Sequence, residues 1–293
     1  MKNFTIISDP GIDDLISLVL LHKLSPQTKN CLISTFGNAT EEITSRNAKE
    51  FISFVANSWQ FMHGSKLPLN GVVERPWPDY FHGPDGVWGV HPPVDVGLIQ
   101  GLPKYPSNNN LISLAPMRDA IKLLKINKSQ NFTIMGGIFN AEGNETKYAE
   151  TNIAFDPDSA AEFFKNCNSV NVKVIPLDVT KKVFWDIGRV KNISENNKIN
   201  KWLKQLLLVW FDKYNHEREK DFNLHDPLAV YLAFYPEKAK WKSSGVKVII
   251  EGEQRGKTVM FNDHPQCQIA LDLVDPLLIS RKIYSLVFEE EAF

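Results

Sequence analysis

Residues 4–14 read FTIISDPGIDD, and this stretch decides the fold of the chain. Residues 4–8 are short, apolar and β-branched, which is typical of a buried strand. Residues 9–11, Asp-Pro-Gly, end the strand, because proline fixes φ and glycine permits a tight turn. From Ile12 the apolar residues recur at helical spacing. The chain therefore opens with a strand that passes directly into a helix.

The same alternation continues along the rest of the chain. It predicts strands at residues 31–36, 111–114, 132–135 and 172–177, helices at 43–55, 116–124, 157–164, 202–214, 227–234 and 279–288, and a hairpin from 246–251 and 258–261. Strands alternating with helices imply parallel pairing through right-handed crossovers. We therefore predict an α/β fold: a single Rossmann-like domain over residues 1–293, with a mostly parallel central sheet, helical additions and a late β-hairpin.

Composition favours a soluble globular protein. Of the 293 residues, 43% are hydrophobic and 23% are charged, which argues against disorder. Lys plus Arg is 33 and Asp plus Glu is 34, so the net charge of -1 gives no long-range attraction to nucleic acid or an anionic membrane. Three scattered cysteines without a C-x-x-C pair argue against a disulfide framework and a thiolate zinc site. With no signal peptide and no apolar run of about 18 residues, a cytoplasmic location is expected.

Candidate site residues follow the predicted strands. In open α/β sheets, ligands bind at the carboxyl ends of the parallel strands. The polar residues at these positions are mostly acids and amides: Asp9, Asp13, Asp14, Asn38, Asn140, Asn144, Asp178, His225 and Asp226. Very few are basic, so a phosphate group has no evident partner.

The acids near the N-terminus form the sharpest candidate. Asp13 and Asp14 fall in the first turn of the predicted helix, where capping alone favours an acid by about 0.3–1 kcal/mol. Capping does not explain Asp9 at the end of the strand. Two carboxylates 4 Å apart repel by about 4 kcal/mol at an effective dielectric constant of 20, so three together need a cation or a proton. Oxygen ligands without His or Cys indicate Ca²⁺ or Mg²⁺ rather than zinc.

Later candidates have structural explanations beside the functional one. Asp226 is a possible fourth acid, but an Asp before a proline also suits the cap of a helix. The same helix N-terminus would lower the pKa of His225. His82 precedes Gly-Pro-Asp-Gly, which turn chemistry alone explains. Glu150 and Asn152 occupy alternate positions, so on an extended segment both would face one polyhydroxylated ligand.

Together these motifs resemble the inosine-uridine-preferring nucleoside hydrolase family. Residues 9–14 resemble its N-terminal D-x-D-P-G-x-D-D signature, and further motifs follow in the family's order. They are Phe36-Gly37-Asn38, His82-Gly83-Pro84-Asp85-Gly86, Met135-Gly136-Gly137, Glu142-Gly143-Asn144, Ala149-Glu150-Thr151-Asn152-Ile153 with Asp156-Pro157, Leu177-Asp178-Val179-Thr180, His225-Asp226-Pro227, and Glu251-Gly252 with Arg255-Gly256-Lys257-Thr258. The resemblance covers nearly the whole chain.

The resemblance implies hydrolysis of the N-glycosidic bond of ribonucleosides to ribose and free base. It assigns one Ca²⁺ to Asp9, Asp14, Asp226 and the Leu114 carbonyl, with Asp9 as general base on the water that the ion orients. It assigns the ribose hydroxyls to Asp13, Asn38, Asn144, Glu150 and Asn152. His225 would assist the departing base, and His82 would help to hold it. A homodimer or homotetramer is also implied.

Two departures from the family keep alternatives open. Ile7 stands where the family has an acid that supports the site from behind, and residues 114–119 read Leu-Ala-Pro-Met-Arg-Asp instead of Thr-Gly-Pro-Leu-Thr-Asn. One alternative is a catalytically impaired protein that binds ribose or nucleosides. The other is a Mg²⁺-dependent phosphatase with an aspartyl nucleophile, which is disfavoured because no lysine follows the strand ends.

Overall fold

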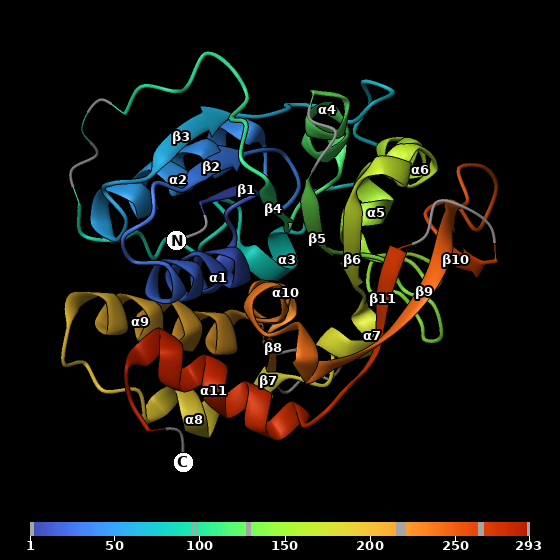
Figure 1. Ribbon diagram of the computed structural model, residues 1–293. Coiled ribbons are helices and arrows are strands. Elements are labelled where there is room, and N and C mark those ends of the chain that lie inside the picture. The colour runs from blue at the N-terminus through green and yellow to red at the C-terminus, as the bar shows by residue number, and fades with distance from the viewer. Residues whose placement is uncertain are drawn as a thin grey trace.

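The computed structural model describes residues 3–94, 97, 99–126, 130–214, 221–262 and 267–291. Within these residues, nine strands form one sheet in the order β10-β9-β11-β6-β5-β4-β1-β2-β3 (Figure 1). Their bounds are β1 Phe4–Ser8, β2 Cys31–Ser34, β3 Gln60–His63, β4 Asn110–Ser113, β5 Asn131–Met135, β6 Asn171–Ile175, β9 Ala239–Val248, β10 Thr258–Phe261 and β11 Cys267–Leu273.

The sheet is mostly parallel, as predicted. All neighbours from β11 through β6, β5, β4, β1 and β2 to β3 pair in parallel. At one edge β9 pairs antiparallel with both β11 and β10, and β9 with β10 forms the predicted late hairpin. The strand order reverses direction between β1 and β4, which is where ligands bind in open α/β sheets.

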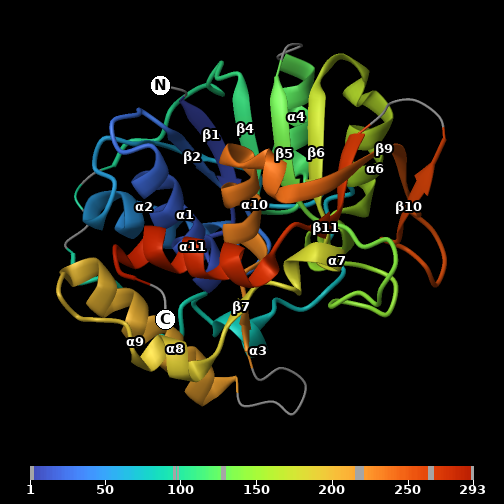
Figure 2. The same cartoon turned by 60° about the horizontal axis from the view of Figure 1, so that its bottom comes forward.

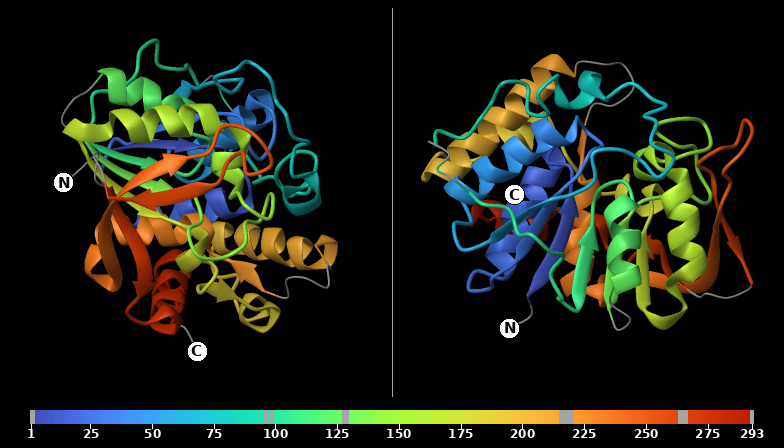
Figure 3. Two further views of the ribbon diagram at one scale, coloured as in Figure 1. Left: turned by 90° about the vertical axis from the view of Figure 1, so that its right-hand side faces the viewer. Right: turned by 90° about the horizontal axis from the view of Figure 1, so that it is seen from above.

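Helices cover both faces of the sheet (Figures 1 and 3). One hydrophobic core lies between the sheet and α1, α2, α9, α10 and α11, and a second lies between the sheet and α4 and α6. The helix bounds are α1 Ile12–Leu24, α2 Glu41–Phe54, α3 Asp79–His82, α4 Arg118–Ile126, α5 Thr151–Phe155, α6 Pro157–Asn166, α7 Leu177–Thr180, α8 Ile187–Lys191, α9 Lys198–Lys213, α10 His225–Phe234 and α11 Pro276–Phe288. In the described part of the chain, no helix has the length and apolar character needed to cross a membrane.

Short elements gather beyond the carboxyl ends of the parallel strands. Figure 2 shows α3, α8 and α9 there, together with β7. The strand β7, Phe184–Trp185, pairs antiparallel with β8, Phe222–Asn223. Of these elements, α3 and β8 lie in the two irregular stretches of the sequence, 64–110 and 212–224. Residues 95, 96, 98 and 215–220 of these stretches lie outside the described residues.

The sequence reasoning missed β3 and β11 of the large sheet and the short strands β7 and β8, and it misplaced β9. β3 has only two buried residues among four, and β11 mixes buried and partly exposed residues without strict alternation, so neither shows a clear periodicity of two. β9 was expected at residues 246–251 but begins at Ala239. The sequence reasoning missed its first half because exposed polar residues, including Lys240, Lys242 and Ser243, interrupt the apolar pattern there. Pairing with β11, and not local pattern, determines the extent of β9.

Candidate active site

The turn between β1 and α1 carries three buried acids. Asp9 follows β1, and Asp13 and Asp14 lie in the first turn of α1. The backbone N–H of Gly11 donates to Oδ2 of Asp14 (3.1 Å), so the capping explanation holds for this acid. The hydroxyl of Ser8 donates to Oδ1 of Asp14 (2.6 Å). The Asp14 carboxylate is therefore held at both oxygens.

Asn38, just after β2, fixes the orientation of two of these acids. Its backbone N–H donates to Oδ2 of Asp9 (2.7 Å), and its side-chain amide donates to Oδ2 of Asp14 (2.8 Å). A Cβ at Gly37 would overlap the Asp9 carboxylate, so only glycine allows this approach. The second oxygen of Asp9, Oδ1, is buried without a hydrogen-bond partner. Because a buried oxygen of this kind is costly to leave unpaired, it indicates a missing ligand.

Asp226 brings a fourth acid to the same place from α10. The alternative explanation, in which Asp226 caps this helix, is wrong: the helix begins at His225, and its N-cap is Leu224, which makes no side-chain cap. Asp226 lies inside the first turn, where its carboxylate is buried. One oxygen each from Asp13, Asp14 and Asp226 lie within 4.8 Å of one another.

The four acids are electrostatically strained without a cation. Burial, reinforced by the charge of Asp14, raises the pKa of Asp13 to about 8. Burial and the neighbouring acids also hold the pKa values of Asp9 and Asp226 well above their usual range. All donors here are oxygen atoms, and one of them, Oδ1 of Asp9, has no partner. This donor set fits a hard divalent cation such as Ca²⁺ or Mg²⁺.

Glu150 and Asn152 approach the acids from the start of α5. The prediction that they lie on an extended segment is wrong, because Glu150 is the N-cap of α5 and accepts the backbone N–H of Asn152 (2.8 Å) and of Ile153 (3.1 Å). Burial raises the pKa of Glu150 to about 7. The Asn152 amide donates to the carbonyl of Leu114 (2.9 Å), the oxygen assigned to the metal by resemblance. One helix start therefore orients both side chains and a backbone carbonyl.

Two histidines, the buried His82 and the partly buried His225, line the same pocket as the acids. Nδ1 of His82 accepts the backbone N–H of Ile12 (3.1 Å), which leaves the ring proton on Nε2. Nδ1 of His225 shares a hydrogen bond with the hydroxyl of Thr180 (2.7 Å). Burial lowers the pKa of both rings to about 3, with a further contribution from His225 to His82 and from Lys181 to His225. Both histidines are therefore neutral near pH 7.

These groups enclose a pocket of about 330 Å³ at the carboxyl ends of the strands. Every residue that the resemblance assigned to the site, except Asp9 and Asp14, lines it: Asp13, Asn38, His82, Leu114, Asn144, Glu150, Asn152, His225 and Asp226. The candidates Asn140 and Asp178 do not line the pocket. Asp9 and Asp14 are buried and contact the pocket through Asn38. The tertiary structure thus brings together residues from six separate stretches of the chain.

Several lining residues were missed by the sequence reasoning. Pro78, Tyr80 and Phe81 come from the long segment before and within α3, and Tyr214 ends α9. Nothing periodic marks these aromatic residues. Lys181 also lines the pocket, although no lysine was expected near the strand ends. The sequence could have indicated Lys181, because it directly follows the Leu177–Thr180 motif at the end of a predicted strand.

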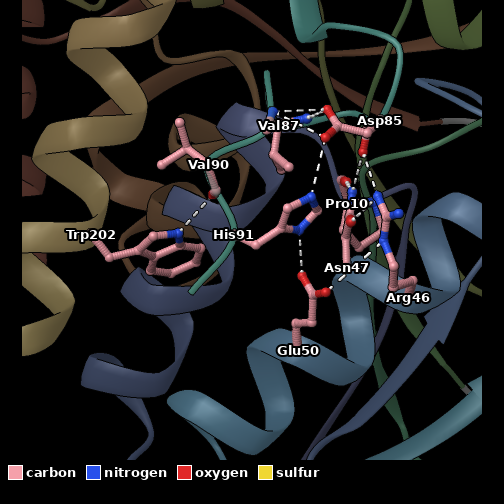
Figure 4. A network of polar contacts seen from close by, with 10 residues as sticks. Pro10, Arg46, Asn47, Glu50, Asp85, Val87, Val90, His91 and Trp202 are labelled. Carbon is pink, nitrogen blue, oxygen red and sulfur yellow. Dashed lines mark hydrogen bonds and ion pairs between the residues drawn. The ribbon is translucent and has the colours of Figure 1, made fainter. Parts of the chain in front are cut away.

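A polar network ties the segment after α3 to α2 (Figure 4). His91 bridges Glu50 (2.8 Å) and Asp85 (3.1 Å) through its two ring nitrogens. Asn47 donates to the backbone carbonyls of Pro10 (2.9 Å) and Asp85 (3.0 Å). This network therefore joins the turn that bears the N-terminal acids to the segment that follows the first histidine.

Comparison with known proteins places this architecture in a family. The family model described as inosine-uridine preferring nucleoside hydrolase matches residues 5–278. The chain belongs to this family. As the sequence predicted, it is a nucleoside hydrolase, an enzyme class that acts on ribonucleosides.

Relatives of this nucleoside hydrolase cover most of its length. The protein named probable uridine nucleosidase 1 of Oryza sativa subsp. japonica is 25% identical over 273 residues, or 86% of this chain and 83% of its own. Non-specific ribonucleoside hydrolase RihC of Salmonella paratyphi A is 27% identical over 294 residues, covering 91% and 92%. A solved plant nucleoside hydrolase, PpNRh1, superposes with a TM-score of 0.88 at 21% identity over 99% of both chains, which shows a shared fold.

Proposed function

We propose that this nucleoside hydrolase cleaves the N-glycosidic bond of ribonucleosides with one bound Ca²⁺, using Asp9 as general base and His225 to assist the leaving base. The observation that carries the proposal is the convergence of Asp13, Asp14 and Asp226 within 4.8 Å at a pocket of about 330 Å³. The clustered carboxylates would repel one another without a cation, and the asparagine side chains around them can bind hydroxyl groups. A bound cation accounts for the carboxylates, and a bound sugar accounts for the amides.

The ion would be held by Asp9, Asp14, Asp226 and the Leu114 carbonyl. Support comes from Oδ1 of Asp9, which is buried and lacks a partner, and from the Asn152 amide, which orients the Leu114 carbonyl. Ca²⁺ is favoured over Mg²⁺ because it accepts six to eight oxygens in flexible geometry, including backbone carbonyls. When bound, the ion supplies positive charge that orients a water and lowers the pKa of that water.

Asp9 is suited to take the proton of the attacking water. One of its oxygens is fixed by the Asn38 backbone N–H at 2.7 Å, so the carboxylate cannot rotate freely, and the other oxygen is open to a ligand. A positioned general base contributes about 10²–10⁴ in rate.

The sugar would lie between the acids and the amides of the pocket. Asp13 and Glu150 offer acceptors for ribose hydroxyls, and Asn38, Asn144 and Asn152 also line this wall. As the base departs, positive charge develops on the sugar ring. Carboxylates fixed nearby stabilise that charge without rearranging, which lowers the barrier.

The two histidines would act on the base as neutral hydrogen-bond donors. With Nδ1 accepting from Ile12, His82 presents its Nε2–H. In the tautomer whose Nδ1 accepts from the Thr180 hydroxyl, His225 presents its Nε2–H in the same way. Since the pKa of each ring is about 3, these groups donate hydrogen bonds and do not carry charge near pH 7.

We propose four further properties of the protein. The substrate is a small-molecule ribonucleoside, which a pocket of about 330 Å³ suits better than a nucleic acid or a membrane. The chain forms a single domain over residues 1–293 and assembles as a homodimer or homotetramer. Its location is cytoplasmic.

A reducing-sugar assay over a nucleoside panel tests the function. We expect ribose release that is abolished when a chelator strips the ion and restored by added Ca²⁺. A parallel assay for phosphate released from phosphomonoesters is the control for the phosphatase alternative. Binding of nucleosides without ribose release, or phosphate release alone, would contradict the proposal.

A further inference from the structure

Lys181 lies at the exposed end of the pocket. It follows α7, lines the cavity, and donates from Nζ to the carbonyl of Glu142 (3.1 Å). The residue is exposed, whereas the acids of the pocket are buried. Among the described residues that line the pocket, it carries the only permanent positive charge.

Under the proposed function, ribose lies against the buried acids Asp13 and Glu150. The base of the nucleoside would then extend toward the open end of the pocket, which Tyr80, Phe81 and Lys181 line. The charge of Lys181 also reaches His225 in the same region.

We propose that Lys181 is a specificity-determining residue, whose ammonium donates a hydrogen bond to an exocyclic carbonyl on the edge of the base remote from ribose. This inference rests on the proposed function. Hypoxanthine presents O6 at that edge and uracil presents O4, and both oxygens are acceptors. Adenine and cytosine present amino groups there, which are donors and leave the ammonium unpaired. Lys181 therefore favours inosine over adenosine and uridine over cytidine.

The same contact assists bond cleavage. The bond between the anomeric carbon and the base nitrogen breaks, and its electron pair moves onto the base and its carbonyl oxygen. Lys181 stabilises the charge that collects on this oxygen. The water oxygen bonds to the anomeric carbon and gives its proton to Asp9, while the departing base takes a proton from solvent. The products are ribose and the neutral base.

A purely structural role for Lys181 is the alternative, because its bond to Glu142 tethers the loop 139–149. That loop has other anchors: the Asp178 carboxylate accepts the backbone N–H groups of Phe139 (2.9 Å) and Asn140 (2.8 Å). An ammonium has three donors, and the carbonyl of Glu142 uses one. The remaining donors are available to a ligand.

Steady-state kinetics of Lys181→Met and Lys181→Arg separate these roles. The four substrates are inosine, adenosine, uridine and cytidine. We expect Lys181→Met to lower kcat/KM for inosine and uridine by roughly 10–100-fold, the usual effect of losing a hydrogen bond from a charged group. Adenosine and cytidine should change by less than about threefold on the same grounds, and Lys181→Arg should retain most of the discrimination.

Lys182→Met is the matched control. Lys182 is the next residue along the chain, is exposed, and pairs with Asp272 (2.9 Å) instead of lining the pocket. We expect kcat/KM for all four substrates to be unchanged in Lys182→Met. Thermal melts of each variant show whether it is folded.

Three outcomes overturn the assignment. Equal losses on all four substrates in Lys181→Met would identify a tether only, and no loss on any would remove Lys181 from recognition. A wild-type preference for adenosine over inosine would also contradict it. A folded wild-type protein that hydrolyses none of the four, with Ca²⁺ present, would instead refute the proposed function itself.

Discussion

Asn38 illustrates how single side chains prepare this pocket. One residue donates to Asp9 through its backbone and to Asp14 through its side chain, so two like charges are oriented by one asparagine. Ile7 is buried in the second hydrophobic core, and the neighbouring Ser8 donates a hydrogen bond to Asp14.

Asp9→Asn tests the general base at the residue scale. The amide keeps the shape of the side chain and an oxygen for the Asn38 N–H, so the variant should fold. It cannot accept a proton, and we expect kcat to fall by about 10²–10⁴. Steady-state assays of ribose release measure this loss.

Asp212→Asn serves as the control for this substitution. Asp212 is an exposed acid on α9, paired with Lys213 at 3.7 Å, and its loss should not change kcat. If Asp9→Asn retained turnover within about threefold of the wild type, another group would have to be the base.

At the scale of elements, helix starts carry most of the chemistry. The first turn of α1 holds Asp13 and Asp14, the start of α5 holds Glu150 and Asn152, and α10 begins with His225. Each helix start presents unpaired backbone N–H groups that stabilise nearby acids. Buried side chains hold these elements in place relative to one another. Asn47 of α2, for example, hydrogen-bonds the backbone carbonyls of Pro10 and Asp85 (Figure 4).

Asn47→Ala tests the contribution of these hydrogen bonds to stability. Removing the amide leaves the carbonyl of Pro10 without its buried donor, so we expect a loss of about 1–3 kcal/mol in the free energy of unfolding. The turn that carries the acids should also loosen and raise KM for nucleosides. Urea titration and steady-state kinetics measure the two effects.

Arg46→Ala is the matched control on the same helix. Arg46 has a side chain that is 45% exposed, and its polar contacts are long: 3.3 Å to the Asp85 carbonyl, 3.4 Å to Oδ1 of Asn47 and 3.9 Å to the Glu50 carboxylate. Its removal should cost less than about 0.5 kcal/mol. Equal costs in the two variants would mean that Asn47 does not have a special structural role.

For the whole molecule, the buried acids link stability to pH. The pKa of Asp13 is raised from 3.8 to about 8, and that of Glu150 from 4.5 to about 7. From about pH 4 to about pH 8, the folded chain therefore binds more protons at these two acids than the unfolded chain does. The stabilisation is therefore complete below about pH 4 and is lost as the pH rises to about 8. A divalent cation bound to the folded state opposes this loss.

Thermal unfolding with and without Ca²⁺ tests this linkage. In a chelator, Tm should fall between pH 5 and pH 8, and the increase in Tm caused by Ca²⁺ should be larger at pH 8. Asp226→Asn should flatten both trends, because it removes one of the repelling charges. A Ca²⁺ effect of equal size at both pH values would contradict the expected coupling.

The sequence by itself determined the alternation of strands and helices and the turn that places Asp9, Asp13 and Asp14 together. These features are local: burial sets the period of each element, and residues close in the chain remain close in space. The order of motifs also led to the family, whose model matches residues 5–278. The positions of most acids and amides in the pocket followed from strand ends.

Only the tertiary structure decided which distant residues share the pocket and what each contacts. Asp226 lies near Asp13 and Asp14 although more than two hundred residues separate them, and the local pattern also allowed a helix cap. Tyr80 and Tyr214 come from segments without periodicity, and Lys181 reaches the pocket only because α7 ends beside it. β11 likewise takes its place through pairing with β6 and β9. Packing between distant segments determines these contacts, and the local spacing of residues along the chain does not predict them.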